Sequence, residues 1–484
     1  MARLRRYLVW AATGAIFSGA LCGPPITLAQ NKDPMVFYDE DGLRLRAHLQ
    51  AGINGVAEED LFWNFADIFA PEANFDADTD WFEAYVMPGI SFNTDSRNDL
   101  TFYGKLSAVA SYTRGIDAFD TGNTGRVTLE EGYFALRYAK SSQLSFDLSF
   151  GPREFKAGTG MLIANGGSSG FQRGALKLGP RKAWRVAALG SVAAGRFSGT
   201  AFYIGPNELP ESHSGTRIVG ADLRYGRTQG NFAGLTVGHV LDSSAPYPKA
   251  APGGVGAPSI LVGARKGLNF INLYGRANPF PKSLAQLFVA GDLAIERNDR
   301  IDLKAWAGRI QVGYVFGKRA WSPTLAYSYQ TFSGDDPSTP ELERFDPLYY
   351  EGNPSAWSTG SKSSMFFLNS NVNGHQISLQ VTPTNRDILT LRYSHIRSNE
   401  LRSPIQYGQG VRLDFSDGSP NAVAGATKKR LADDIYLEYI RKLNTHIYLT
   451  AGVSASIPGP GIRSIGTAGL PNWKGSFVNV VVNY

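Results

Sequence analysis

The chain has 484 residues, with 48 Lys and Arg against 42 Asp and Glu, and a formal net charge of +6. Glycine is abundant at 54 residues, and the mean hydropathy of -0.19 excludes a bundle of membrane-spanning helices. The positive balance is too mild to indicate a nucleic-acid partner, because three of the basic residues lie in the first six positions.

The N-terminus is predicted to be a secretory signal peptide. Three arginines precede an apolar run at 8–21, and small residues follow up to Ala29. We expect cleavage after Ala29, which gives a signal peptide at 1–29 and one barrel domain at 30–484. A membrane anchor is the alternative, but the run is shorter than the roughly 20 residues of a spanning helix. Cys22 is the only cysteine, so the mature chain would form no disulfide and no thiolate metal site.

Apolar and polar residues alternate along the chain from residue 43 onward, with the two-residue period of β-strands. In GLRLRAHLQAG at 42–52, the leucines occupy one parity, and Arg44 and Arg46 the other. Similar segments follow at 100–111, 145–150, 219–225, 376–381, 389–394 and 447–454. About eighteen segments of roughly 8 to 14 residues show this alternation, and that length crosses a bilayer as a tilted strand.

The links between these segments alternate between long and short. Short links are expected at 93–99, 140–143, 383–387 and 443–446. Long links are expected at 53–80, 113–126, 156–170, 242–267, 332–373, 399–430 and 457–473. The short link at 297–301 breaks the pattern, and 171–204 is hard to divide. The alternation is typical of outer-membrane barrels, which have tight periplasmic turns and longer outer loops.

The sequence ends in FVNVVVNY, a strand pattern that closes on an aromatic residue, Tyr484. Tyr484 would lie in the periplasmic aromatic girdle. The fold class that we expect is therefore all-β, a transmembrane antiparallel β-barrel of about 18 strands in the bacterial outer membrane, with long extracellular loops and short periplasmic turns. A large soluble β-sandwich or repeat protein is the alternative. A soluble barrel would bury inside the apolar parity that a membrane barrel turns to lipid.

Residue patterns for catalysis are missing from the sequence. The six histidines lack the spacing of a zinc-binding helix, and neither a G-x-S-x-G elbow nor a Walker-type glycine loop is present. We therefore expect no enzymatic activity, no catalytic residue, no metal and no cofactor. Two alternatives are an outer-membrane hydrolase, with its catalytic residues converging from separate strands, and a surface adhesin that binds through the loop at 332–373.

If the apolar parity meets lipid, the opposite parity lines the lumen. It carries the candidate residues of a solute pathway: Arg44, Arg46, Lys105, Arg137, Arg153, Arg224, Arg276, Arg309 and Arg392. An excess of arginine favours a carboxylate-bearing solute, through bidentate pairing and a raised local anion concentration. The alternative is that these charges pair with acidic residues on neighbouring strands and stiffen the wall. Arg44 and Arg46 occupy successive inward positions, which favours a role in selecting the solute over a role in charge pairing.

Four segments resemble the alginate export family of outer-membrane barrels. They are LEEGYFALRY at 129–138, FGPREFKAGTGMLIAN at 150–165, SYQTFSGDDPSTPELERFDPLYYEG at 328–352 and NSNVNGHQISLQVTPT at 369–384. The most specific part runs from FSGDDP to FDPLYY, and the resemblance covers about residues 80–456.

The resemblance implies a monomeric barrel of eighteen strands whose Arg-rich lumen exports an anionic exopolysaccharide. By position, Arg153 and Glu154 match a charged pair of the family, and Arg137 ends the preceding motif strand. A long periplasmic loop that helps close the pore in the family is replaced here by LNTH at 443–446, which argues against gated export. The resemblance also places three weak metal candidates in an outer loop, where they close the loop on itself or bind a cation: Asp335, Asp336 and Asp346.

The sequence thus predicts an outer-membrane channel that passes a polar, anionic carbohydrate, such as alginate or a related exopolysaccharide, through an Arg-lined lumen. The alternative with the same fold is an uptake porin for small sugars, organic acids or aromatics. The expected partners are membrane lipid and lipopolysaccharide, the anionic polysaccharide or oligosaccharide, and the barrel-insertion machinery, without nucleic acid.

Overall fold

The computed structural model describes residues 33–484, except for 66–75, 97, 119–121, 142–143, 168–170, 211–212, 227–229, 318–319, 353–356, 361–366, 407–422 and 466–468. The expected signal peptide at 1–29 lies outside the described residues. Among the described residues, no helix has both the length and the apolar character needed to cross a membrane.

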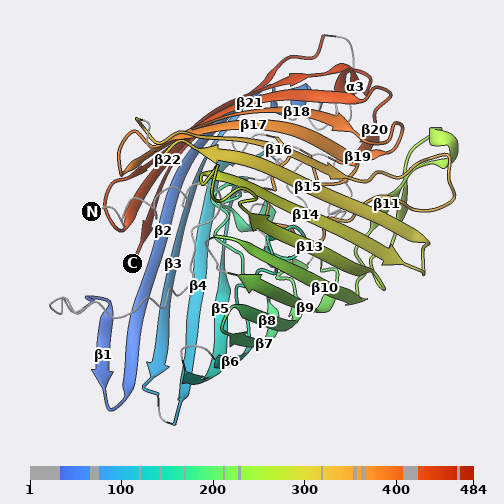
Figure 1. Cartoon of the computed structure of the whole chain (residues 1–484). Helices are drawn as coiled ribbons and strands as arrows, with labels where there is room; N and C mark the ends of the chain where they lie inside the picture. Colours follow the sequence, from blue (N-terminus) through green and yellow to red (C-terminus); the bar gives the residue numbers. More distant parts are fainter. Residues whose placement is uncertain are drawn as a thin grey trace.

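One antiparallel sheet of 19 strands dominates the described part of the chain. The first strand, β1 (Val36–Glu40), pairs only with β2, and all the others follow one another around a closed barrel (Figure 1). The last strand pairs with β2 over Gln50–Glu59 and closes the ring. The barrel strands are β2 (Leu43–Glu59), β3 (Thr79–Thr94), β4 (Leu100–Ile116), β5 (Gly122–Ser141), β6 (Leu144–Phe150), β7 (Val186–Ala194), β8 (Phe197–Gly205), β9 (Arg217–Gly226), β10 (Phe232–Asp242), β13 (Asn269–Ala277), β14 (Leu287–Asn298), β15 (Leu303–Val315), β16 (Thr324–Phe332), β17 (Val372–Val381), β18 (Asp387–Ser398), β21 (Arg430–Lys442), β22 (Ile447–Pro458) and β23 (Trp473–Asn483).

Side chains on these strands alternate between an exposed apolar face and a covered face. On β4, for example, Leu106 is 56% exposed and the adjacent Ser107 only 3%. This inverts the arrangement of a soluble barrel, because the apolar side chains point outward to where lipid would lie. The expected fold class, a transmembrane antiparallel barrel of about 18 strands, is confirmed.

The strand β1 covers an edge that the rest of the barrel leaves open. It pairs with the first residues of β2, from Arg46 to Leu43, beyond the end of β23. The two strands are joined by Asp41 and Gly42, both with positive φ, as an Asp-Gly hairpin turn requires. The sequence analysis did not identify β1, although its turn carries this signature.

The loops are distributed unequally between the two ends of the barrel. The long connections gather at the end opposite to the C-terminus (Figure 1) and include β11 (Tyr247–Lys249), β12 (Ser259–Leu261), β19 (Pro404–Gln406), β20 (Val423–Gly425), α3 (Pro460–Arg463) and the 3-10 turns η1 (Leu61–Asn64), η3 (Phe171–Arg173) and η5 (Pro252–Gly254). The expected long link at 113–126 is wrong, because β4 and β5 extend into it and leave only 117–121 between them. The first long link is also shorter than expected, 60–78, because β2 continues to Glu59.

The region at 171–204, which the alternation could not divide, contains the end of one loop and the strands β7 and β8. This loop spans 151–185 and is much longer than the link expected at 156–170; we name it the first lumen loop. It begins where β6 ends, at Gly151, whose φ is 115° and where a Cβ would lie 2.2 Å from the carbonyl oxygen of Gly132. Only glycine fits this position, so Gly151 allows the chain to leave the wall.

Candidate solute pathway through the barrel

The first lumen loop is held against the inner wall by a buried carboxylate on β3. The backbone N–H groups of Lys177 and Leu178 donate to the two carboxylate oxygens of Glu83 at 2.9 Å each. Trp81 Nε1 on the same strand also donates to Glu83 at 2.8 Å. A buried carboxylate is unfavourable unless it accepts hydrogen bonds. Glu83 is buried, so a displaced first lumen loop would leave its carboxylate without two donors.

A second clamp lies on β5. The backbone N–H groups of Lys182 and Ala183 both donate to Glu130 Oε1 at 2.7 Å. The Arg181 guanidinium, buried beside them, donates to Thr128 Oγ1 at 2.8 Å and to Ser111 Oγ at 2.9 Å. The loop is therefore fixed to β3, β4 and β5 by charged groups on both sides of the contact.

The loop between β16 and β17, at 333–371, also folds inward; we name it the second lumen loop. It meets the first at a parallel bridge between Ile163 and Tyr349, where Tyr349 N–H donates to Leu162 O at 2.9 Å. Lys156 Nζ lies 3.2 Å from Glu351 Oε1, and Thr159 donates to the carboxylate of Asp292 on β14. The two loops thus join opposite walls and narrow the lumen.

The three acidic residues considered as metal candidates bind backbone and arginine groups. Asp346 accepts from Arg265 Nε at 2.6 Å and from Nη2 at 2.9 Å. Asp335 accepts the backbone N–H groups of Ala250 and Glu343, at 2.7 and 2.9 Å, and Asp336 that of Ser338, two residues on. Within the described residues, no group of three or more His, Cys, Asp or Glu could hold a metal ion.

Six of the candidate pathway arginines share one arrangement, in which the guanidinium lies over an aromatic ring. Such contacts orient an arginine without neutralising its charge. From the guanidinium carbon to the ring centroid, the distances are 5.0 Å for Arg137 over Tyr103, 4.3 Å for Arg153 over Tyr133, 3.9 Å for Arg224 over Phe232, 3.9 Å for Arg276 over Phe288, 5.1 Å for Arg309 over Trp357 and 5.9 Å for Arg392 over Tyr436.

Arg137 and Arg153 lie together and share one carboxylate. Arg137 Nε donates to Asp147 Oδ2 at 3.0 Å, and Arg153 Nη1 lies 4.0 Å from Asp147 Oδ1. Tyr103 OH donates to the same carboxylate at 2.6 Å. Two positively charged side chains thus share one carboxylate.

Arg44 and Arg46 lie apart from this cluster, at the end of the barrel that β1 covers. Arg46 Nε is 2.8 Å from Asp33 Oδ2, and Arg44 Nε is 3.7 Å from Asp39 Oδ2 on β1. Each therefore has an acidic partner in the segment before β2. Lys105 is ion-paired with Glu131 on β5. The roles of all these residues in a solute pathway stay predictions.

Arg309 and Arg392 face the lumen from the wall opposite to Arg137. The Nε atoms of both are buried without a hydrogen-bond partner among the described residues. The space between Arg309, the β16–β18 wall and residues 358–360 of the second lumen loop has a volume of only about 10 Å³. This space is too small for a solute.

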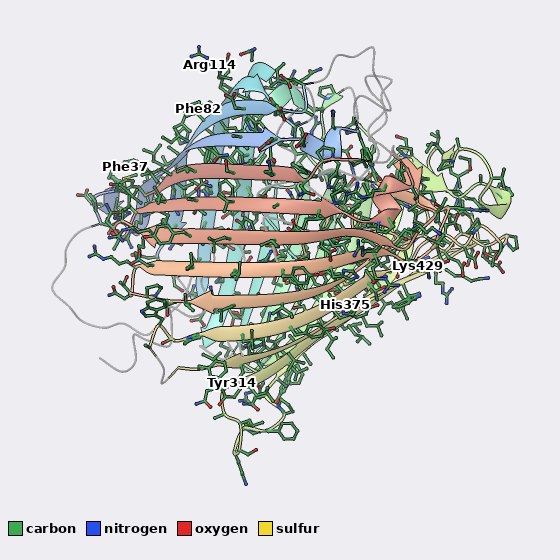
Figure 2. The ribbon with its side chains drawn as sticks, turned by 90° about the horizontal axis from the view of Figure 1, so that it is seen from above. Phe37, Phe82, Arg114, Tyr314, His375 and Lys429 are labelled. Atoms are coloured by element: carbon green, nitrogen blue, oxygen red, sulfur yellow. The ribbon has the colours of Figure 1, made fainter. Side chains whose placement is uncertain are left out.

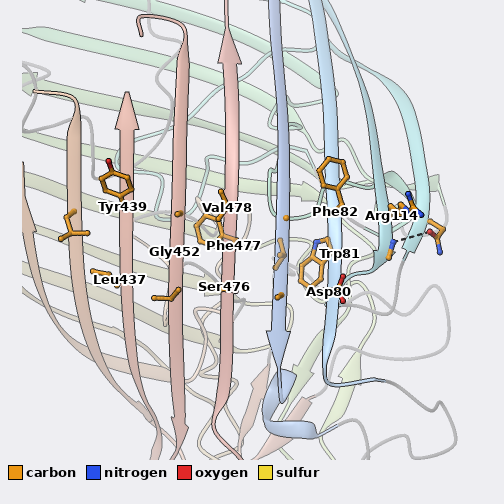
Figure 3. A pocket seen from close by; sticks show the side chains of 18 residues that line it. Asp80, Trp81, Phe82, Arg114, Leu437, Tyr439, Gly452, Ser476, Phe477 and Val478 are labelled. Carbon is orange, nitrogen blue, oxygen red and sulfur yellow. Dashed lines mark hydrogen bonds between the residues drawn. The ribbon is translucent and has the colours of Figure 1, made fainter. Parts of the chain in front are cut away.

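A larger hollow, of about 880 Å³, lies on the outer face of the barrel around the seam between β23 and β2 (Figure 3). Its lining includes outward side chains such as Phe82, Val453 and Val478, each about half exposed. It is therefore not part of the lumen.

The sequence analysis missed the aromatic partners of the arginines and both carboxylate clamps. Tyr103 and Tyr133 have the same parity as Lys105 and Arg137, so their inward direction was readable from the alternation. Trp357 was not, because it lies in a loop whose inward path depends on contacts far along the chain. The same holds for Glu130, whose partners are more than 50 residues away.

Comparisons with known proteins found one matching family and several solved structures of low sequence identity. Residues 289–469 match the model of a family described as alginate export. No curated protein sequence matches the chain. The solved structure of OccAB2 from Acinetobacter baumannii is 8% identical, with a TM-score of 0.50 over 90% of this chain and 98% of that one. Salmonella typhi OmpF in complex with daunomycin is 11% identical, with a TM-score of 0.41 over 93% and 100%. OmpT of Vibrio cholerae is 10% identical, with a TM-score of 0.39 over 92% and 99%.

The resemblance to the alginate export family is thus confirmed, over a range that begins later than the sequence motifs suggested. The likeness to OccAB2 supports the barrel fold alone. Fold, family match and the apolar outer face together make this protein a channel of the bacterial outer membrane.

The Glu83 clamp yields a prediction about the first lumen loop. Replacing Glu83 with Ala leaves the backbone N–H groups of Lys177 and Leu178 without acceptors, at a cost of about 1–3 kcal/mol for each. Amide hydrogen exchange at 177–183, followed by mass spectrometry, should accelerate about tenfold or more. The matched control is Glu59→Ala, which removes an exposed carboxylate from β2. Equal exchange in the two variants would contradict the clamp.

Proposed function

We propose that this outer-membrane barrel, whose residues 289–469 match the alginate export family, passes a polar, anionic carbohydrate through its lumen by diffusion. A uronate-type sugar offers a carboxylate, which arginine binds through two parallel N–H donors, and a ring face, which packs against an aromatic side chain. The function needs no chemical step. Alginate or a related exopolysaccharide has this chemistry.

The observation that carries the proposal is the arginine-over-aromatic arrangement. An arginine held by a carboxylate loses much of its charge to that partner, whereas one held by a ring keeps its charge and the N–H donors along its edge. Arg137 and Arg153 lie over tyrosines and share only Asp147. They therefore form the best candidate site for a carboxylate in the lumen.

Flux through a channel requires several weak sites rather than one strong site. Arg224, Arg276, Arg309 and Arg392 supply further positive positions around the wall. Acidic side chains such as Asp292 and Asp434 lie among them, which keeps any one position from holding an anion too tightly. The lumen loops add a size limit, since they meet inside the barrel.

Ion selectivity tests the proposal directly. In planar bilayers, Arg137→Glu together with Arg153→Glu should reverse or strongly reduce the anion preference, because the change removes two positive charges and adds two negative ones. The reversal potential under a salt gradient measures this preference. Arg114→Glu, at an exposed arginine on the outer parity of β4, should leave it unchanged. The proposal fails if the double variant keeps the wild-type selectivity while still forming pores.

The proposal also predicts a pH effect from Glu154, which lies in the first lumen loop near Glu131, Lys105 and Lys182. Burial raises the pKa of the Glu154 carboxyl above its usual value, although the two lysines oppose this shift. Glu154 is therefore protonated at a higher pH than an ordinary glutamate, and the lumen gains positive charge as the pH falls.

Anion selectivity should thus rise when the pH is lowered from about 7.5 towards about 5. The same reversal-potential measurement on Glu154→Gln should show a smaller rise, and Glu59→Gln, at an exposed position, the full rise of the wild type. A Glu154→Gln profile identical to that of the wild type would refute the assignment.

A further inference from the structure

A group of basic side chains lies on the outer surface of the barrel, at the end where the long loops gather. We name it the outer rim patch and define it by His375 on β17, His395 and Arg397 on β18, and Lys429 and Arg430 at the start of β21. Figure 2 shows His375 and Lys429 on neighbouring parts of this rim. His375, Arg397, Lys429 and Arg430 are exposed, so the patch faces the surroundings of the barrel and not its lumen.

The strand register places like charges opposite one another in this patch. Arg397 pairs directly with Arg430 across β18 and β21, and His375 pairs with His395 across β17 and β18. Like charges directly opposite on an antiparallel pair destabilise it. An anion bound between Arg397 and Arg430 would remove this repulsion.

Within the described part of the chain, the acidic side chains near the patch do not balance its positive charge. Asp433 is shared by three groups: His395 Nδ1 at 2.6 Å, Tyr393 OH at 2.9 Å and Arg430 Nη1 at 3.7 Å. Glu400 lies within electrostatic reach of Lys429. Arg397 forms no ion pair within 4.0 Å with any residue that the structure describes. Among the residues that the structure describes, two carboxylates therefore face three permanent cations and two histidines.

The side chains below the patch follow the order of a membrane interface. Moving along β18 away from the loops, Arg397 and His395 are followed by the exposed Tyr393 and then by Leu391. On β17, His375 is followed by Ile377, and on β21, Arg430 and Asp433 are followed by Ile435. Cations, then aromatic rings, then aliphatic side chains match the headgroup, interface and hydrocarbon levels of a lipid layer.

We propose that the outer rim patch binds the phosphate groups of lipid A, the membrane anchor of lipopolysaccharide. Lipid A is a phosphorylated lipid of the outer leaflet, which is the leaflet at the level of the long loops. Its phosphates lie between Arg397 and Arg430, with Lys429 beside them, and its acyl chains lie along Tyr393, Leu391 and Ile377. The bidentate geometry of arginine suits phosphate oxygens. The site is independent of the solute that passes through the lumen.

Binding of lipid A to the purified full chain in detergent tests this proposal. Titration with diphosphoryl lipid A should show a dissociation constant about tenfold or more higher for the variant Arg397→Gln with Arg430→Gln than for the wild type. Lys429→Gln should weaken binding in the same direction by a smaller factor. Arg114→Gln, an exposed outward arginine on β4, is the matched control and should bind as the wild type does.

Comparison ligands and a folding check separate the possible outcomes. Inorganic phosphate and phosphatidylglycerol should bind much more weakly than lipid A, and the double variant should keep the heat-dependent gel shift of a folded barrel. Equal affinity of the wild type and the folded double variant for lipid A would overturn the proposal. Binding of phosphatidylglycerol as tight as that of lipid A would overturn it too. If the double variant does not fold, the single variants Lys429→Gln and Arg397→Gln replace it. Wild-type affinity of both folded single variants for lipid A would then overturn the proposal.

Discussion

The barrel wall of this protein is a closed ladder of backbone hydrogen bonds. In a lipid layer, each backbone N–H and C=O needs a partner within the wall, and only a helix or a closed sheet provides one. Pairing of β2 with β23 closes the sheet, and β1 covers the part of β2 that extends beyond β23. Closure of the sheet fixes which side chains point inward, so every second residue of a strand faces the lumen. The backbone arrangement therefore determines which side chains line the channel.

The lumen that results is narrowed where the two lumen loops meet. The first lumen loop brings charged and polar groups into the interior, and the wall meets them with the buried carboxylates of Glu83 and Glu130. Buried charges are tolerated only when donors surround them, so the loop and the wall stabilise each other. A channel selects solutes by the width of its constriction and by the electric field of its fixed charges. A narrowed lumen with fixed charges supplies both.

Structural features that depend on neighbouring residues could be predicted well from the sequence. Features that depend on residues far apart in the chain could be predicted only poorly. The alternation around Arg44, Arg309 and Arg392 predicts strand and face, because the period of a strand is local. The inward path of 151–185 could not be predicted, because it rests on contacts between Lys177 and Glu83 or Ala183 and Glu130, far apart in the chain. The acidic partners of Arg44 and Arg46 were missed for a related reason, since the contact of residues 33–40 with β2 was not predicted.

Proteoliposome swelling measures whether this channel prefers an anionic carbohydrate. Uronate oligomers and neutral oligosaccharides of equal length would be compared as permeants. The uronates should enter faster, and their advantage should shrink at high salt because screening weakens the field of the lumen arginines. Equal or faster entry of the neutral oligosaccharides at low salt would contradict it.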